Sequence, residues 1–278
     1  MVRALLAMIS VLMLAVAPLR APAAAPVAAA APAGVALLTI DGAIGPASAD
    51  YIVRGIARAA GARHGLLIIR MDTPGGLDTA MRSAIKAILT SPLPVVTWVA
   101  PGGARAASAG TYILYASHVA AMAPGTNLGA ATPVEIGIGG PQEPAPPRAQ
   151  PPPGNGNKTE GSAMTRKQVN DAAAYLRGLA QLRGRNADWA ERAVRESVSL
   201  TAAEALRQGV IEIVAPDVPS LLAQLDGRSV LVLGEPRRLN TGNAAVVDLL
   251  PDWRTDVLGD NVSVKVNAVL YFRVVDPE

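Results

Sequence analysis

The sequence lacks cysteine altogether and contains few aromatic residues, histidines and lysines. Without cysteine the chain can form no disulfide, no thiolate nucleophile and no cysteine-ligated metal site. Only 3% of the residues are aromatic although 50% are hydrophobic, so alanine and valine supply much of the apolar content. The chain has two histidines, His64 and His118. No metal-ligand constellation is visible in the sequence, and we expect neither metal nor cofactor.

The positive charge of the chain is small and does not indicate a nucleic-acid partner. The net charge is +3, and a cleaved leader would remove Arg3 and Arg20 and no acid, leaving 3 − 2 = +1. No dense cluster of Lys and Arg interleaved with aromatic residues is present, which argues against nucleic-acid binding. The length of 278 residues suits one domain with extensions.

The N-terminal residues 1–31 have the layout of a secretory signal peptide followed by a small-residue linker. Arg3 precedes an apolar stretch from Ala4 to Ala17, which is followed by small residues and prolines. This stretch is shorter than the roughly 20 residues that a membrane span needs. We therefore predict export to the periplasmic or extracytoplasmic face of the membrane, with an uncleaved anchor as the alternative.

Strand-like and helix-like patterns alternate three times in the first half of the chain. Apolar runs begin near Val35, Gly65 and Leu93, and each is followed by a segment with helical spacing of its apolar residues. This alternation predicts an α/β core with a parallel sheet and crossover helices. In such folds ligands bind at the carboxyl ends of the strands.

A proline- and glycine-rich excursion, residues 139–163, interrupts this pattern and cannot form a packed element. Helical segments resume after it, and Thr201 followed by Glu204 forms a capping box at the start of one of them.

Two glycine-bearing motifs, "TPGG" and "PGGARAASAG", fall at predicted carboxyl ends of strands. Ser108 in the second motif has two interpretations, a nucleophile or a helix N-cap, and spacing alone favours the N-cap. As a nucleophile it would need an oxyanion site, which backbone N–H groups can supply. Gly75 and Gly76 could offer such donors without side-chain obstruction.

The base that would activate Ser108 is not a histidine. His64 precedes its strand and belongs at the opposite edge of the sheet, and His118 ends a helix about 15 Å from Ser108. A lysine is the other known partner of a catalytic serine. The chain has four: Lys86, Lys158, Lys167 and Lys265. Lys167, which opens the helix after the excursion, is the one that could return over the site.

Asp72 and Asp78 flank "TPGG", but no histidine or cysteine lies near them. We interpret Asp72 as a turn or cap residue rather than a metal ligand.

Three segments carry a resemblance to a known family: "MDTPGG", "ASAGTYILYASHVAAMAPGTNLGAATP" and "GRNADWAERAVRESVSLTAAEALRQGVIEIVA". Together they resemble the protease domain of NfeD-type membrane-bound serine proteases. That family belongs to the ClpP/crotonase superfamily and is related to signal peptide peptidase A. The resemblance covers most of residues 32–240 and reverses the preference for the N-cap interpretation.

The resemblance implies a ClpP-like fold and a Ser-Lys dyad with Ser108 as the nucleophile. Gly75 and Gly76 would form the oxyanion hole and hold the substrate strand, with Ala109 next to the nucleophile. Residues 139–163 would be a flap over the cleft. Similar proteins cleave hydrophobic segments of a stomatin-like partner, and they form homo-oligomers.

The lysine of the dyad departs from the family pattern. There it lies in a helical segment similar to "AYLRGLAQ", where this chain has Arg177. Arginine cannot be deprotonated in a protein, so Arg177 cannot act as a base. We therefore expect Lys167 to take the role, and an inactive protease is the alternative.

The C-terminal residues depart from the family as well. After a linker at residues 241–254, residues 255–278 resemble the start of a stomatin-like domain and form an alternating, β-rich pattern. We interpret them as a truncated fragment produced by a fusion.

Three rival functions remain at this point. The chain could be a catalytically dead module that grips hydrophobic peptides, a crotonase-like acyl-CoA enzyme, or a scaffold for stomatin-like assemblies. The leader argues against CoA chemistry, which is normally intracellular.

Overall fold

The computed structural model describes residues 34–133 and 158–251. The predicted leader (1–31), most of the predicted flap and the stomatin-like fragment (255–278) lie outside the described residues.

A six-stranded sheet forms the centre of the described part, with the strand order β11-β1-β2-β3-β5-β8. Every neighbouring pair in it is parallel. Its strands are β1 (Val35–Asp41), β2 (Leu66–Asp72), β3 (Val95–Val99), β5 (Val119–Met122), β8 (Ile213–Val214) and β11 (Val246–Asp248). Parallel strands covered on both faces read as continuous apolar runs, which is how β1, β2 and β3 read. The predicted α/β fold is confirmed.

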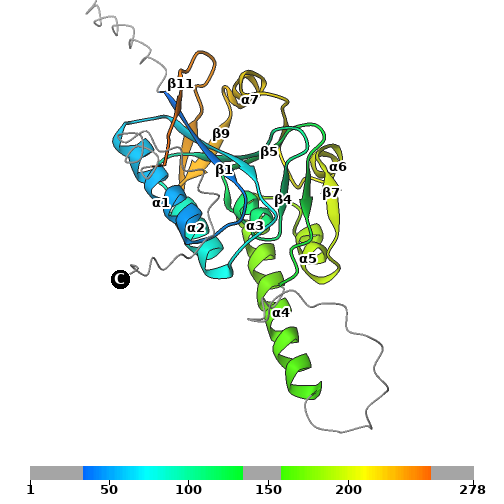
Figure 1. Cartoon of the computed structure of the whole chain (residues 1–278). Coiled ribbons are helices and arrows are strands. Elements are labelled where there is room, and N and C mark those ends of the chain that lie inside the picture. The colour runs from blue at the N-terminus through cyan, green and yellow to red at the C-terminus, as the bar shows by residue number, and fades with distance from the viewer. Residues whose placement is uncertain (1–33, 134–157, 252–278) are drawn as a thin grey trace, which may run out of the picture. The chain divides into compact units, whose positions relative to one another are not determined.

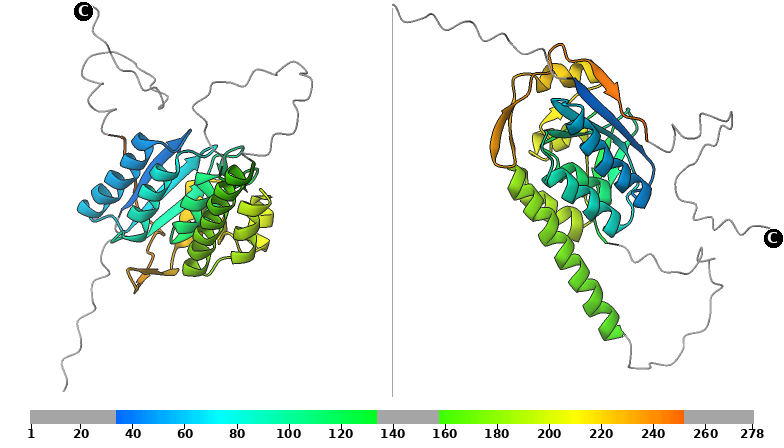
Figure 2. Two further views of the ribbon diagram at one scale, coloured as in Figure 1. Left: turned by 90° about the horizontal axis from the view of Figure 1, so that it is seen from below. Right: turned by 90° about the vertical axis from the view of Figure 1, so that its left-hand side faces the viewer.

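Alternate residues of the strands enter two separate cores. Ala36 and Leu38 of β1 pack into the larger core, while Val35 and Leu37 pack into the smaller one. The helices on the larger face are α1 (Pro46–Gly61), α2 (Asp78–Leu89), α3 (Ala109–Ala116), α4 (Lys158–Arg183), α5 (Ala187–Arg195) and α6 (Ala202–Arg207). The first five follow one another across this face, each against the next (Figures 1 and 2).

The other face is covered by α7 (Val218–Leu225) and the chain that follows it. This chain includes an antiparallel hairpin of β9 (Ser229–Val232) and β10 (Glu235–Arg238). A third, small sheet of β4 (Arg105–Ala107), β6 (Asn127–Gly129) and β7 (Ser199–Thr201) lies next to the start of α3. The predicted capping box is present: Thr201 N–H donates to Glu204 Oε2 over 2.9 Å at the start of α6.

Two secondary-structure elements extend across predicted boundaries. The linker expected at residues 241–254 contains β11, which pairs with β1, and the buried Leu249 follows it, so the domain continues beyond Asn240. Helix α4 begins at Lys158, inside the predicted flap (139–163). Good helix formers such as Lys158 and Met164 extend the helix through Gly161 there, so Lys167 lies well inside the helix rather than in its first turn.

Within residues 34–133 and 158–251, no helix has both the length and the apolar character required to cross a bilayer.

Candidate active site

Ser108 stands where β4 ends and α3 begins, at the N-cap position of the helix. Its backbone has φ 49° and ψ −116°, and its N–H donates to Gly129 O over 3.1 Å. Its side chain makes no capping hydrogen bond. An ordinary N-cap serine uses its hydroxyl to bond the first turn of the helix. The N-cap interpretation is therefore wrong for the side chain, whose hydroxyl is left available.

The positive φ of Ser108 is uncommon for a residue with a side chain and is a form of backbone strain found at functional sites. The sequence around it makes the sharp turn possible. At Gly110 an added Cβ would lie 2.5 Å from Thr73 Cγ2, so only glycine lets α3 start this close to the end of β2. The turn presents Ser108 at the carboxyl edge of the sheet, as predicted from the motif.

Gly75 lies directly against the Ser108 side chain. A Cβ built on Gly75 would be 2.8 Å from Ser108 Cβ and 3.3 Å from its Oγ, and Gly75 has φ +119°. Both features exclude other residues at this position. The structure therefore brings together the two motifs, "TPGG" and "ASAG", that the sequence placed at neighbouring strand ends.

The backbone N–H groups near Ser108 differ in whether they already donate a hydrogen bond within the protein. Gly75 N–H donates to Thr73 Oγ1 over 3.1 Å. Among the described residues, the N–H groups of Gly76 and Ala109 have no hydrogen-bond acceptor. The Gly76 N–H has no acceptor because of how this segment pairs with Ile44. Leu77 N–H donates to Ile44 O, and the N–H of the preceding residue, Gly76, therefore points away from Ile44.

Neither histidine lies at this edge. His64 lies two residues before β2 and His118 directly precedes β5, so both are at the amino ends of parallel strands. Asp72 Oδ1 accepts from Arg105 N–H over 3.0 Å and joins the end of β2 to the start of β4. Asp72 thus has a structural role, but the bond joins two distant segments rather than forming the local turn or cap that was predicted. In the described ranges no three His, Asp or Glu side chains group as metal ligands.

Helix α4 runs parallel to α3, which decides where Lys167 lies relative to Ser108. Tyr112 OH donates to Ala172 O over 3.4 Å, and further along both helices Arg183 Nε donates to Ala116 O over 2.8 Å. Ser108 is four residues before Tyr112, about 6 Å, and Lys167 is five residues before Ala172, about 7.5 Å. Lys167, an exposed residue, therefore belongs to the turn of α4 at the Ser108 end.

A polar and aromatic cluster, which sequence reasoning missed, fixes α4 at this level. Tyr112 OH also donates to Ala131 O over 3.2 Å, and its ring stacks on Tyr175 with 6.0 Å between centroids. Arg82 of α2 lies 4.5 Å from the Tyr175 ring and forms an ion pair with Asp171 over 2.7 Å. The cluster joins residues far apart in the chain, and no local motif signals it.

Arg177 points to a different partner. Its Nη1 donates to Glu191 Oε2 over 2.7 Å and forms an ion pair that joins α4 to α5. The same carboxylate accepts from Arg195. Arg177 is therefore held in an interhelical contact.

Comparison with known proteins gives a consistent result. A family model described as the N-terminal domain of NfeD1b matches residues 34–141. The chain is 40% identical over 194 residues to the membrane-bound protease PH1510 of Pyrococcus horikoshii. The match covers 69% of this chain and 40% of the relative, so the chain spans less than half the length of that protein.

Solved structures of the N-terminal part of such a protease are similar along almost their whole length. One is a serine-to-alanine mutant of the membrane-bound stomatin-specific protease 1510-N, with a TM-score of 0.68 and 38% identity over 80% of this chain and 99% of that one. Another is a lysine-to-alanine mutant in complex with a substrate peptide, with a TM-score of 0.69 and 37% identity over 82% and 97% of the two chains.

Proposed function

The chain belongs to the NfeD-type family of membrane-bound proteases, and on that premise we propose that it is a serine endopeptidase with Ser108 as its nucleophile. The observation that carries the proposal is the placement of Ser108. It occupies a strained turn at the carboxyl edge of the sheet, with its hydroxyl uncapped and Gly75 against it.

The reaction would begin when Ser108 Oγ attacks the carbonyl carbon of the scissile peptide bond. The hydroxyl proton passes to the base and then to the leaving amine, and an acyl-enzyme forms. Water attacks the ester in the second half, which releases the acid and restores the serine.

Backbone donors supply the oxyanion site in this proposal. Gly76 and Ala109 fit the role because, among the described residues, their N–H groups have no acceptor. Gly75 contributes differently, since its N–H is already bonded to Thr73 Oγ1. It leaves room for the substrate beside Ser108. The loss of one such donor typically lowers kcat by about 10²–10³-fold.

Lys167 is the residue that we propose as the base. The parallel packing of α3 and α4 supports this role because it sets Lys167 and Ser108 at the same end of the two helices. The Arg177–Glu191 ion pair supports a structural role for Arg177 instead.

The substrate and location follow from the relatives and the leader. The similar solved structures are described as specific for stomatin, one of them for a stomatin homologue from Pyrococcus horikoshii. We propose that this chain cleaves hydrophobic segments of a stomatin-like partner, as a homo-oligomer on the extracytoplasmic face of the membrane. Leu77, next to Gly76 and 40% exposed, supports a preference for apolar substrates.

A catalytically impaired peptide-binding module, or a scaffold for stomatin-like proteins, is the second candidate. The observation in its favour is that Ser108 Oγ makes no hydrogen bond to any residue that the structure describes.

Labelling of the full chain with a fluorophosphonate probe tests the proposal. We expect the parent to be labelled and Ser108→Ala to be unlabelled, because the probe reports an activated serine. Lys167→Met should also lose labelling, whereas the matched change Lys86→Met on the exposed side of α2 should not.

Two results would contradict parts of the proposal separately. A parent chain that is folded by circular dichroism but never labelled removes the protease function and favours the binding module. Full labelling of Lys167→Met leaves Ser108 as the nucleophile and removes only Lys167 as the base.

A further inference from the structure

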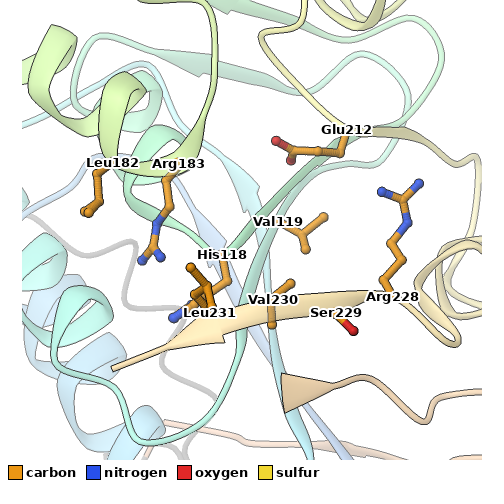
Figure 3. A pocket seen from close by; sticks show the side chains of 9 residues that line it. All are labelled: His118, Val119, Leu182, Arg183, Glu212, Arg228, Ser229, Val230 and Leu231. Atoms are coloured by element: carbon orange, nitrogen blue, oxygen red, sulfur yellow. The ribbon is translucent and has the colours of Figure 1, made fainter. Parts of the chain in front are cut away.

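A second site lies at the amino edge of the sheet, opposite the edge that carries Ser108. It is a pocket of about 340 Å³ between the end of α4, the starts of β5 and β8, and strand β9. Figure 3 shows β9 crossing the pocket with Arg228 and Leu231, while Leu182 and Arg183 descend from α4. His118 and Glu212 precede β5 and β8, which places the pocket at the amino ends of the strands.

The acidic side chain of the pocket is already neutralised. Both oxygens of Glu212 accept from Arg185, over 2.7 and 2.9 Å, and Oε2 also accepts from Ala120 N–H. Arg185 has a side chain that is only 1% exposed, so this ion pair is internal. Glu212 is therefore held by a cation outside the pocket lining.

Arg183 is left as a half-buried cation beside that pair. Its Nε donates to Ala116 O, and among the described residues no carboxylate pairs with it. Burial and the neighbouring Arg185 lower the pKa of Arg183 to about 10, so it stays charged at neutral pH. The nearest carboxylate, Glu212, attracts Arg183 but is already bonded to Arg185, so a bound anion would further stabilise this half-buried cation.

Two further groups can donate to the same ligand. Arg228 uses Nε to reach Gln224 O, which leaves its two terminal nitrogens available. His118 Nδ1 accepts from Val95 N–H over 3.1 Å, so the neutral ring carries its proton on Nε2. Burial, Arg183 and Arg185 lower the pKa of His118 to about 3, which keeps the ring neutral at neutral pH.

The rest of the lining is apolar and partly in contact with water. Leu182 is 60% exposed and Leu231 is 63% exposed, although both are large hydrophobic residues. They come from different elements, α4 and β9, and both line the pocket. Donors and cations thus lie beside apolar surface that nothing in the described chain covers.

We propose that this pocket binds an anionic amphiphile, a carboxylate or phosphate group carried on a hydrocarbon chain. Arg183 and Arg228 would hold the anionic group, since guanidinium pairs well with both anions. Leu182 and Leu231 would contact the hydrocarbon. Both a free fatty acid and the headgroup region of an anionic phospholipid present this chemistry.

Calorimetric titration of the full chain with octanoate and with octyl phosphate tests the proposal. We expect binding that weakens at least tenfold in Arg228→Gln and several-fold in Leu231→Ser. Arg237→Gln and Leu233→Ser are matched controls because they change exposed residues of the same hairpin that lie outside the pocket lining. Both should bind as the parent does. Arg183→Gln should abolish binding. If that variant fails to fold, Arg228→Gln still tests the proposal, because Arg228 is exposed.

Three results would overturn the proposal. They are no binding of either amphiphile at millimolar concentration, equal binding by pocket and control variants, or acetate binding as tightly as octanoate. Co-sedimentation with phosphatidylglycerol vesicles, compared with phosphatidylcholine vesicles, then identifies the source of the ligand. A difference between Arg228→Gln and Arg237→Gln on the anionic vesicles assigns a membrane lipid, and no difference assigns a free amphiphile. The apolar N-terminal stretch is present in all variants and cancels in this comparison.

Discussion

At the carboxyl edge of the sheet the chain builds its site from backbone and small residues, whereas at the amino edge it uses long charged side chains. Ser108 has Gly75 against its side chain and Ala109 next to it in the chain, and its turn is fixed by steric contacts and backbone hydrogen bonds. The amino edge is fixed by the Arg185–Glu212 pair, with Arg183 and Arg228 around it.

The two edges of the sheet differ in how they respond to amino-acid substitution. Backbone donors keep their positions without loss of side-chain entropy, so the carboxyl edge is rigid but admits almost no substitution. The amino edge depends on a buried charge pair, whose removal affects the free energy of unfolding more than the geometry of Ser108. The two edges should therefore respond to mutation in different observables.

The largest effect on stability should come from Arg185→Met. It leaves the Glu212 carboxylate, 29% exposed, without its bidentate partner and removes hydrogen bonds to Leu114 O and Tyr115 O. Breaking a buried pair from one side costs about 3–5 kcal/mol. Urea denaturation should show this loss, while the activity per folded molecule stays near that of the parent.

The exposed pair Arg192–Glu196 provides the control, since both side chains are 55% exposed. Arg192→Met should cost less than about 1 kcal/mol. Equal losses in the two variants would show that the amino edge is not held by its buried charges.

Apart from Ser108→Ala and Lys167→Met, the largest effect on activity alone should come from Gly75→Ala. The added methyl group would lie 2.8 Å from Ser108 Cβ and force the nucleophile or the loop to move. We expect kcat/KM on a peptide substrate to fall by about 10²–10³-fold, the range seen when one oxyanion donor is displaced, because the moving loop carries the neighbouring donor Gly76.

Gly42→Ala is the control for Gly75→Ala. Gly42 also has a positive φ, +105°, but an added Cβ there would have nothing within 4 Å. It should lose stability of about 1–2 kcal/mol from backbone strain alone and keep its activity. If the two variants lose activity alike, strain rather than contact with Ser108 explains the effect.

The place of the two glycine-bearing motifs at the carboxyl edge could be predicted from the sequence because the motifs are local, whereas the role of Ser108 was inferred only from the family resemblance, since spacing alone favoured an N-cap. Glycines before α2 and small residues around Ser108 are required by turns that few other residues can form, so they leave a readable pattern. The main strands could be predicted for the same reason, since β1 and β2 are buried on both sides and continuously apolar.

The amino edge could not be predicted. Its pocket combines four residues from different elements: His118, Arg183, Glu212 and Arg228. The first and last are 228 − 118 = 110 residues apart, and His118 meets Glu212 because β5 and β8 are neighbours in the sheet. The short strand β11 was not predicted from the sequence for a related reason. β11 is three residues long and gains its stability from pairing with β1, so its sequence alone resembled a linker.

A smaller effect should appear when pH is lowered, and His118 at the amino edge should contribute to it. The pKa of His118 is about 3 in the folded chain and about 6.5 when unfolded, so between these values the unfolded chain binds the extra proton. Stability should fall as pH falls through this window, by about 1.4 kcal/mol per pH unit at its steepest.

His118→Gln keeps an acceptor for Val95 N–H but cannot titrate. Its free energy of unfolding, measured in urea between pH 7 and 4, should fall less steeply than that of the parent. Parallel curves for the two proteins would show that His118 is not the group responsible.

The smallest effect should come from Arg177→Met. The Arg177–Glu191 pair is partly exposed, 43% and 29%, and Glu191 keeps its second partner, Arg195. The loss should be below about 1 kcal/mol. The labelling rate of Ser108 should stay unchanged, because an arginine that cannot be deprotonated and is paired with α5 takes no part in the proton transfer.

Combining Arg177→Lys with Lys167→Met tests whether a lysine at position 177 can replace Lys167 as the base. If a lysine at position 177 restores labelling to Lys167→Met, the base can act from either turn of α4. If it restores none, the register between α3 and α4 confines the base to the turn that holds Lys167.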